Sequence, residues 1–103
     1  MNKTLIGGLF ALLLATTAAA QSATLDAIQR DPVRFDRRSV ILRGTVGLVE
    51  SGARPTFVLI DGAQTIRVVA PPGPPVKPGD RVEVEGLYSF AGNQIEAHRL
   101  TWR

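Results

Sequence analysis

Short apolar segments, broken by glycine, proline, asparagine and aspartate, fill the chain from residue 40 to residue 102. Within most of these segments apolar and polar residues alternate, which is the period of a β-strand with one buried face. Five short strands at this spacing, separated by turn residues, are typical of all-β sandwiches and barrels. We therefore predict a small all-β barrel.

The first segment, residues 39–50, predicts a long strand that is interrupted by Gly44 and Gly47. Its even-numbered residues, from Val40 to Leu48, are predicted to fall on one face and its odd-numbered residues on the other. Glycine inside a strand weakens the strand unless the chain must bend or bulge there. We therefore predict that this strand curls between two sheets, as closure of a small barrel requires.

The other four strands are predicted at residues 56–61, 64–70, 81–90 and 94–102. Asp61-Gly62 indicates a tight hairpin, and Ala91-Gly92-Asn93 indicates a second one. Residues 71–78 are rich in proline, which lacks the N–H donor of a strand, so they predict a stiff, extended connection. In the last strand the alternation slips near His98, which predicts a bulge there.

A short helix is predicted directly before the strands. Thr24 suits its N-cap, and Leu25 and Ile28 are spaced to face the same side. Pro32 disfavours helical backbone at the residue before it, so the helix should end after about two turns. Asp36 then predicts a turn, in which its side chain is expected to hydrogen-bond nearby backbone.

Residues 1–20 have the features of an export signal. Lys3 supplies a positive charge, residues 5–15 form an apolar run, and Ala18-Ala19-Ala20 fits the rule for signal peptidase. The run is too short to span a membrane, and no basic stop-transfer cluster follows it. We expect cleavage after Ala20, with the signal in the membrane only during export. An uncleaved N-terminal anchor is the alternative.

The expected domains are accordingly a signal peptide at residues 1–20 and one globular domain at residues 21–103. We expect the mature form to be periplasmic and not anchored to the membrane. The chain has no cysteine, so disulfides cannot stabilise this small domain. Its core must come from a well-packed closed sheet or from a partner.

Few residues suggest chemistry. His98 is the single histidine, and a tight metal site would need several converging ligands, of which only Glu96 is near in sequence. No nucleophile elbow and no phosphate-binding loop motif is present. The formal net charge is +3, and the densest basic group, residues 30–38, alternates with aspartate instead of forming a basic stripe. We predict a protein that is not an enzyme and that holds no metal or other cofactor.

Four strings resemble the OB-fold of small exported bacterial and tRNA-anticodon-like domains: LDAIQRDPVRFDRRSVILRGTV, FVLIDGAQTIRVVA, VKPGDRVEVEGLY and QIEAHRL. The shared features are the glycine-interrupted first strand, the Asp-Gly hairpin and the Lys-Pro-Gly-Asp entry into the fourth strand. The resemblance implies a five-stranded Greek-key OB-fold barrel with a short N-terminal helix. Many OB-folds place a helix between strands three and four, and here the proline-rich residues 71–78 stand in its place.

One similar group is the bacterial OB-fold family of small periplasmic, stress-associated proteins. Another is the periplasmic haem chaperone of cytochrome c maturation, which attaches haem through a histidine in a tail beyond the barrel. His98 lies inside the last predicted strand, and the tail motif is missing. Haem binding is therefore not carried over to this chain.

OB-folds bind oligonucleotides or oligosaccharides across strands two and three and the adjoining loops. In this chain that region comprises residues 57–69 and the loops 50–55 and 89–93. As ligand-binding residues we predict Arg43, Thr65 and Arg67, together with Tyr88 or Phe90 as a stacking ring at the rim.

The structural alternative for the aromatic residues is favoured. It places Phe57, Phe90 and Trp102 in the core and at the barrel ends, where a small barrel needs bulk.

Three functions remain open. The first is a binding module for an unknown small ligand, glycan or envelope protein, with a link to envelope stress. The second is a structural subunit that docks on a larger envelope assembly through an edge strand or the proline-rich residues 71–78. The third is oligonucleotide binding. Export would separate the chain from RNA and genomic DNA, so nucleic acid is not expected as a partner.

Overall fold

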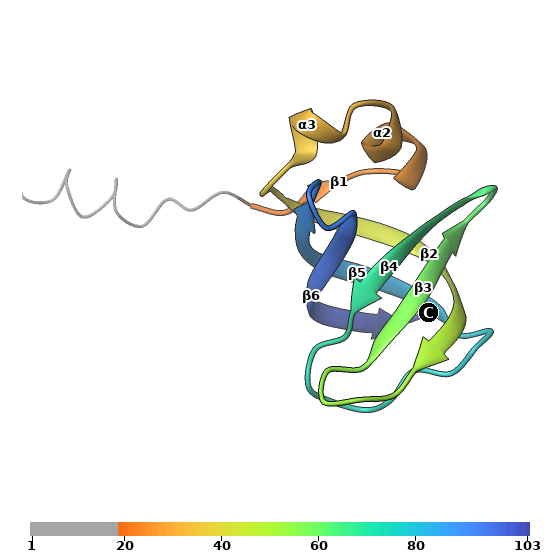
Figure 1. Cartoon of the computed structure of the whole chain (residues 1–103). Coiled ribbons are helices and arrows are strands. Elements are labelled where there is room, and N and C mark those ends of the chain that lie inside the picture. Colours follow the sequence, from red (N-terminus) through yellow and green to blue (C-terminus); the bar gives the residue numbers. More distant parts are fainter. Residues whose placement is uncertain (1–18) are drawn as a thin grey trace, which may run out of the picture.

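The structure is a computed structural model that describes residues 19–103. Its strands curl into a small barrel, and two short helices lie together at one end of it (Figure 1). The predicted all-β barrel with a short N-terminal helix is confirmed. The predicted signal peptide falls on residues that lie almost entirely outside the described part of the chain, so its cleavage stays a prediction.

The described residues form these elements: β1 (Gln21–Ser22), α2 (Leu25–Arg30), α3 (Pro32–Phe35), β2 (Ser39–Glu50), β3 (Thr56–Asp61), β4 (Gln64–Val69), β5 (Arg81–Ser89) and β6 (Gln94–Trp102). The five predicted strands are β2 to β6, and β4 and β5 each end one residue earlier than predicted. The short elements β1 and α3 were missed because a few residues show no period. Within residues 19–103, neither helix has the length and apolar content needed to cross a membrane.

The barrel closes because β2 pairs with both β5 and β3. Its first half, from Ser39 to Thr45, pairs antiparallel with β5, and its second half, from Thr45 to Glu50, pairs antiparallel with β3. The strand order is β1-β2-β3-β4-β6-β5, and the β2–β5 pairing closes the ring. The β4–β6 pairing is parallel, which needs a long connection instead of a hairpin. The proline-rich segment and β5 provide that connection.

Gly44 lies where β2 changes partner. A Cβ added to Gly44 would overlap the backbone oxygen of Ile60, so only glycine lets β3 approach this closely. The predicted curl of this strand is therefore confirmed, although it passes from β5 to β3 within one closed sheet and not between two sheets. The register then shifts between Val46 and Val49, and this bulge turns Leu48 outward, leaving it 68% exposed. The prediction that Leu48 shares one face with Val40 and Val46 was wrong for that reason.

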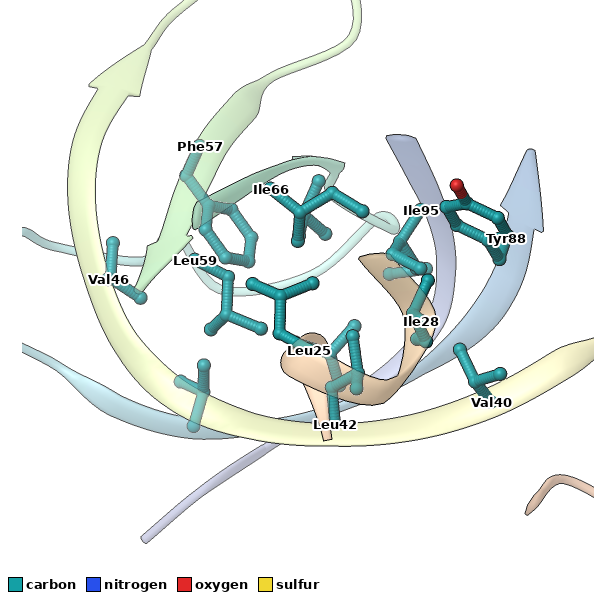
Figure 2. Packing of buried hydrophobic residues seen from close by; sticks show 14 of the residues in the cluster. Leu25, Ile28, Val40, Leu42, Val46, Phe57, Leu59, Ile66, Tyr88 and Ile95 are labelled. Atoms are coloured by element: carbon teal, nitrogen blue, oxygen red, sulfur yellow. The ribbon is translucent and has the colours of Figure 1, made fainter. Parts of the chain in front are cut away.

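The helix α2 plugs one end of the barrel. The Thr24 hydroxyl accepts a hydrogen bond from the Ala27 amide, so the predicted N-cap is confirmed. Leu25 and Ile28 are fully buried, and Figure 2 shows them inside the ring of strands, next to core residues such as Ile95. The helix that closes the barrel therefore precedes the first long strand, which is why the proline-rich connection between β4 and β5 needs no helix.

The aromatic residues are divided between the core and the surface differently from the prediction. Phe57 and Tyr88 are both 1% exposed and belong to the core (Figure 2), whereas Phe90 and Trp102 are 49% and 41% exposed. Tyr88 was predicted at the rim, but it has the parity of Val84 on β5, so it faces inward. The placement of Phe57 in the core is confirmed.

The last strand has the predicted bulge. Glu85 pairs with Arg99 while Gly86 pairs with Ala97, so His98 is left over between two paired positions. The extra residue reverses the alternation beyond it.

Candidate ligand-binding surface

Four side chains form one row across the outer face of the barrel. Thr65 pairs with Ile60, Ile60 pairs with Thr45, and Thr45 also pairs with Arg81. Cross-strand partners project from the same side of a sheet, so the row runs over β4, β3, β2 and β5. Thr65 and Arg81 are exposed, Ile60 is 36% exposed, and Thr45 is half-buried. We call these four residues the outer row.

A second row begins at Arg43, two residues before Thr45 on β2. Arg43 pairs with Glu83, and Arg43 Nε lies 2.9 Å from Glu83 Oε1. The same oxygen lies 3.5 Å from Nη1 of Arg103, whose backbone amide donates to the carbonyl of Arg81. One carboxylate therefore orients two guanidinium groups beside the outer row.

A hollow of about 370 Å³ opens where β2 leaves β5 for β3. Its walls include three arginines and one acid: Arg43, Arg81, Arg103 and Asp61. We call it the arginine hollow. A wider depression of about 760 Å³, bounded by β1, α2 and α3, lies next to it, because Arg43 and Asp61 line both.

The structure brings only part of the predicted site together. Arg43 lines the arginine hollow and Thr65 belongs to the outer row, whereas Arg67 pairs with Val58 and Gln94 on a separate row. Through Gln94, which also pairs with Ser89, that row leads to the loop 89–93.

Two predicted aromatic residues lie apart from the outer row. Phe90 is exposed in the loop 89–93, and Tyr88 is in the core, where its ring cannot stack on a ligand.

Sequence reasoning missed Arg81, Arg103 and Thr45. The alternation of β5, with Glu83 and Glu85 outward, already places Arg81 on the outer face. Nothing in a single sequence shows that Thr45 contacts two strands, because that follows from register.

The loops 50–55 and 89–93 are held by long-range contacts. Asp36 Oδ1 accepts a hydrogen bond from the Phe90 amide at 2.9 Å, not from nearby backbone as predicted. Arg54 Nη2, in the loop 50–55, lies 3.4 Å from Glu96 Oε2 of β6. Burial raises the pKa of the Tyr88 hydroxyl, and the negative charge of Asp36 raises it further.

Within residues 19–103, no three histidine, aspartate or glutamate side chains gather as a metal site would require. His98 lines a separate hollow of about 190 Å³ between the proline-rich segment and the end of β6.

The chain is similar to solved structures in fold, whereas no match is found by sequence. No family model and no curated protein matches the chain. Among solved structures, yeast Stn1 and Ten1 gives a TM-score of 0.71 at 14% identity, covering 84% of this chain and 64% of that one. Telomere capping protein Ten1 from Saccharomyces pombe gives 0.66 at 15% identity, covering 82% and 81%. The hypothetical protein ygiW from E. coli gives 0.63 at 21% identity, covering 84% and 100%.

These likenesses show that the chain is a small OB-fold domain, which confirms the predicted fold. They also correct one expectation. Nucleic acid was not expected as a partner, yet the solved structures with this fold include a protein named for capping telomeres and an Stn1–Ten1 complex. The expectation was wrong because it rested on the compartment inferred from residues 1–20 and not on the surface of the barrel.

Proposed function

We propose that this chain is an OB-fold binding module that takes a polar ligand on the outer row and the adjoining arginine hollow. The observation that carries the proposal is the continuous row from Thr65 to Arg81 across four strands, with the hollow beside it. The helices lie at one end of the barrel (Figure 1), where Gln29 of α2 donates to the Thr65 carbonyl at 2.9 Å, and the side chains of Thr65, Ile60 and Arg81 are exposed.

The chemistry of the surface favours hydrogen bonds and charge over stacking. It offers two hydroxyl groups, the half-exposed side chain of Ile60 and several guanidinium donors. Phe57 of β3 and Tyr88 of β5 lie on strands that carry the outer row, but both side chains point into the core. Oligonucleotides and oligosaccharides both occupy this region of OB-folds, and both present the polar groups that such a surface binds.

Binding without catalysis is part of the proposal. His98, which is the only histidine, lines neither the arginine hollow nor the depression next to it. The hydroxyls of Thr45 and Thr65 have no histidine among the residues lining the arginine hollow to activate them as nucleophiles. We also propose, from the pattern of residues 1–20, that the module acts after export to the periplasm.

Titrations with two labelled probes test the binding face: a single-stranded oligothymidylate and a β-1,4-linked oligosaccharide. The variant Thr45→Glu puts a bulky negative charge in the middle of the outer row, and we expect it to weaken binding of whichever probe binds by at least about tenfold. His98→Glu on β6 is the control, because His98 is an exposed strand residue that lines neither the arginine hollow nor the depression next to it. Equal binding by the two variants would reject this face.

A docking role is the second candidate function. Trp102 is 41% exposed, donates through Nε1 to Asp80 at 3.1 Å, and lines a hollow together with prolines of residues 71–78. Rigid proline-rich segments next to an exposed ring suit protein recognition. Capture of one defined envelope protein by the native chain, lost on Trp102→Ala and kept on Thr45→Glu, would support it. Capture that is the same with both variants would count against it.

A further inference from the structure

We propose that the arginine hollow binds a phosphate group of the ligand. The inference rests on the proposed function and deepens it, because it assigns a chemical class to one part of the ligand. It starts from the placement of three arginines. Arg43 comes from β2, Arg81 from the start of β5, and Arg103 from the residue after β6, and all three line the same hollow.

Backbone pairing places these arginines. Arg43 pairs with Glu83 across β2 and β5, and Arg81, two residues before Glu83, projects from the same side of β5. The backbone amide of Arg103 donates to the Arg81 carbonyl at 2.8 Å. The three guanidinium groups are thus carried by neighbouring backbone segments of one sheet, so little further ordering is needed to present them together.

Glu83 holds two of the guanidinium groups and leaves most of their donors free. Its Oε1 lies 2.9 Å from Nε of Arg43 and 3.5 Å from Nη1 of Arg103. A guanidinium has five N–H donors, so each arginine keeps most of them for a ligand. Within residues 19–103, Arg81 takes part in none of the ion pairs, and its charge is available in full.

The charge of the hollow favours an anion. Three guanidinium groups face two carboxylates, those of Glu83 and Asp61. Asp61 is also engaged by the backbone amide of Leu25, which donates to its Oδ2 at 3.3 Å. Both of these carboxylates are therefore engaged, whereas Arg81 has no carboxylate partner within residues 19–103. Its volume, about 370 Å³, falls in the lower part of the range of ligand pockets, about 300–1,000 Å³.

The number of donors distinguishes phosphate from carboxylate. A carboxylate has two oxygens, which one arginine fork satisfies. A phosphate offers three or more oxygens in different directions, so it can accept from guanidinium groups that approach from three sides. Arg43, Arg81 and Arg103 approach from three backbone segments, and that arrangement matches phosphate better.

Calorimetric titration of the native chain with inorganic phosphate, thymidine 5′-monophosphate and thymidine tests the site. We expect saturable binding of the two phosphate compounds and none of thymidine. Arg81→Gln should weaken this binding at least about tenfold, as the loss of one charge-assisted contact predicts. Arg99→Gln is the matched control: Arg99 is an exposed arginine of β6, 3.9 Å from Glu85, and it does not line the hollow. Thermal unfolding of each variant shows that it is folded.

A further titration with oligothymidylate distinguishes a free phosphate compound from a phosphate of a nucleic-acid backbone. Binding of inorganic phosphate that depends on Arg81 identifies a small phosphate as sufficient, and Arg81-dependent binding of oligothymidylate alone identifies a backbone phosphate. Both outcomes support the inference. Equal weakening by Arg81→Gln and Arg99→Gln, or no Arg81-dependent binding of any phosphate, overturns it. If no phosphate binds in an Arg81-dependent way but an uncharged oligosaccharide binds in a Thr45-dependent way, the phosphate site is wrong while the proposed function stands.

Discussion

Asp36 and Phe90 are joined across the fold: the Asp36 carboxylate accepts a hydrogen bond from the Phe90 backbone amide at 2.9 Å, although 54 residues separate them. Two backbone hydrogen bonds run alongside, from Arg37 to the Tyr88 carbonyl and from Tyr88 to the Arg38 carbonyl. The end of α3 thereby fixes the start of the loop 89–93, one of the two loops that border the ligand region of an OB-fold.

Removal of this contact should loosen the loop. We expect Asp36→Ala to lower the free energy of unfolding by about 1 kcal/mol, the net worth of one hydrogen bond, and to speed amide exchange at Phe90. Asp31→Ala is the control, because Asp31 makes no side-chain hydrogen bond at the N-cap of α3. Unchanged exchange at Phe90 in Asp36→Ala would contradict the proposed tether.

Tyr88 should titrate at high pH. It is the only tyrosine, and burial followed by the charge of Asp36 raises its pKa above the ordinary 10.0. A raised folded-state pKa means that the native chain holds the proton more tightly than the unfolded chain. The resulting stability is complete below the unfolded pKa and is lost as the pH rises through the folded value. Absorbance at the tyrosinate band measures this, and Tyr88→Phe should remove the alkaline loss of stability. Titration at the ordinary pKa would show that Tyr88 is solvated.

Gly44 should tolerate no side chain. A Cβ there meets the Ile60 carbonyl, so we expect Gly44→Ala to cost about 1–3 kcal/mol through overpacking between β2 and β3. Gly52→Ala provides the comparison, because a Cβ at Gly52 meets no atom within 4 Å. Urea unfolding measures both, and equal midpoints would mean that β2 does not pass β3 this closely.

The plug formed by α2 should be a large part of the core. Leu25 is fully buried, so Leu25→Ala should lower the free energy of unfolding by about 2–5 kcal/mol. Val33→Ala, on α3, removes a side chain that is 70% exposed and should have little effect. Thermal denaturation compares the two, and a small effect of Leu25→Ala would place α2 outside the cooperative unit.

The export prediction has its own test. Protein recovered from a periplasmic fraction should begin at Gln21, as intact-mass analysis would show. A chain that starts at Gln21 should unfold cooperatively, since β1 begins there and the core comes from residues after it. A membrane-bound species that retains Met1 would identify an anchor instead.

Much of the fold could be predicted because its signals are local. The N-cap at Thr24, the Asp61-Gly62 hairpin and the bulge at His98 each depend on the residue and its immediate neighbours in the chain. Alternation likewise marked the five long strands, since the period of a strand appears in any run of several residues. The same rule applied to β5 places Tyr88 inside, and the prediction of Tyr88 at the rim did not follow it.

The binding surface depended on pairings between distant residues, which a single sequence does not contain. Thr45 joins the outer row because it pairs with both Ile60 and Arg81, and Arg103 reaches the hollow because its backbone pairs with Arg81. The chain by itself determined which residues lie in strands and which face of most strands is apolar. Only the tertiary structure decided which side chains meet, because register sets those distances and arises from closure of the whole barrel.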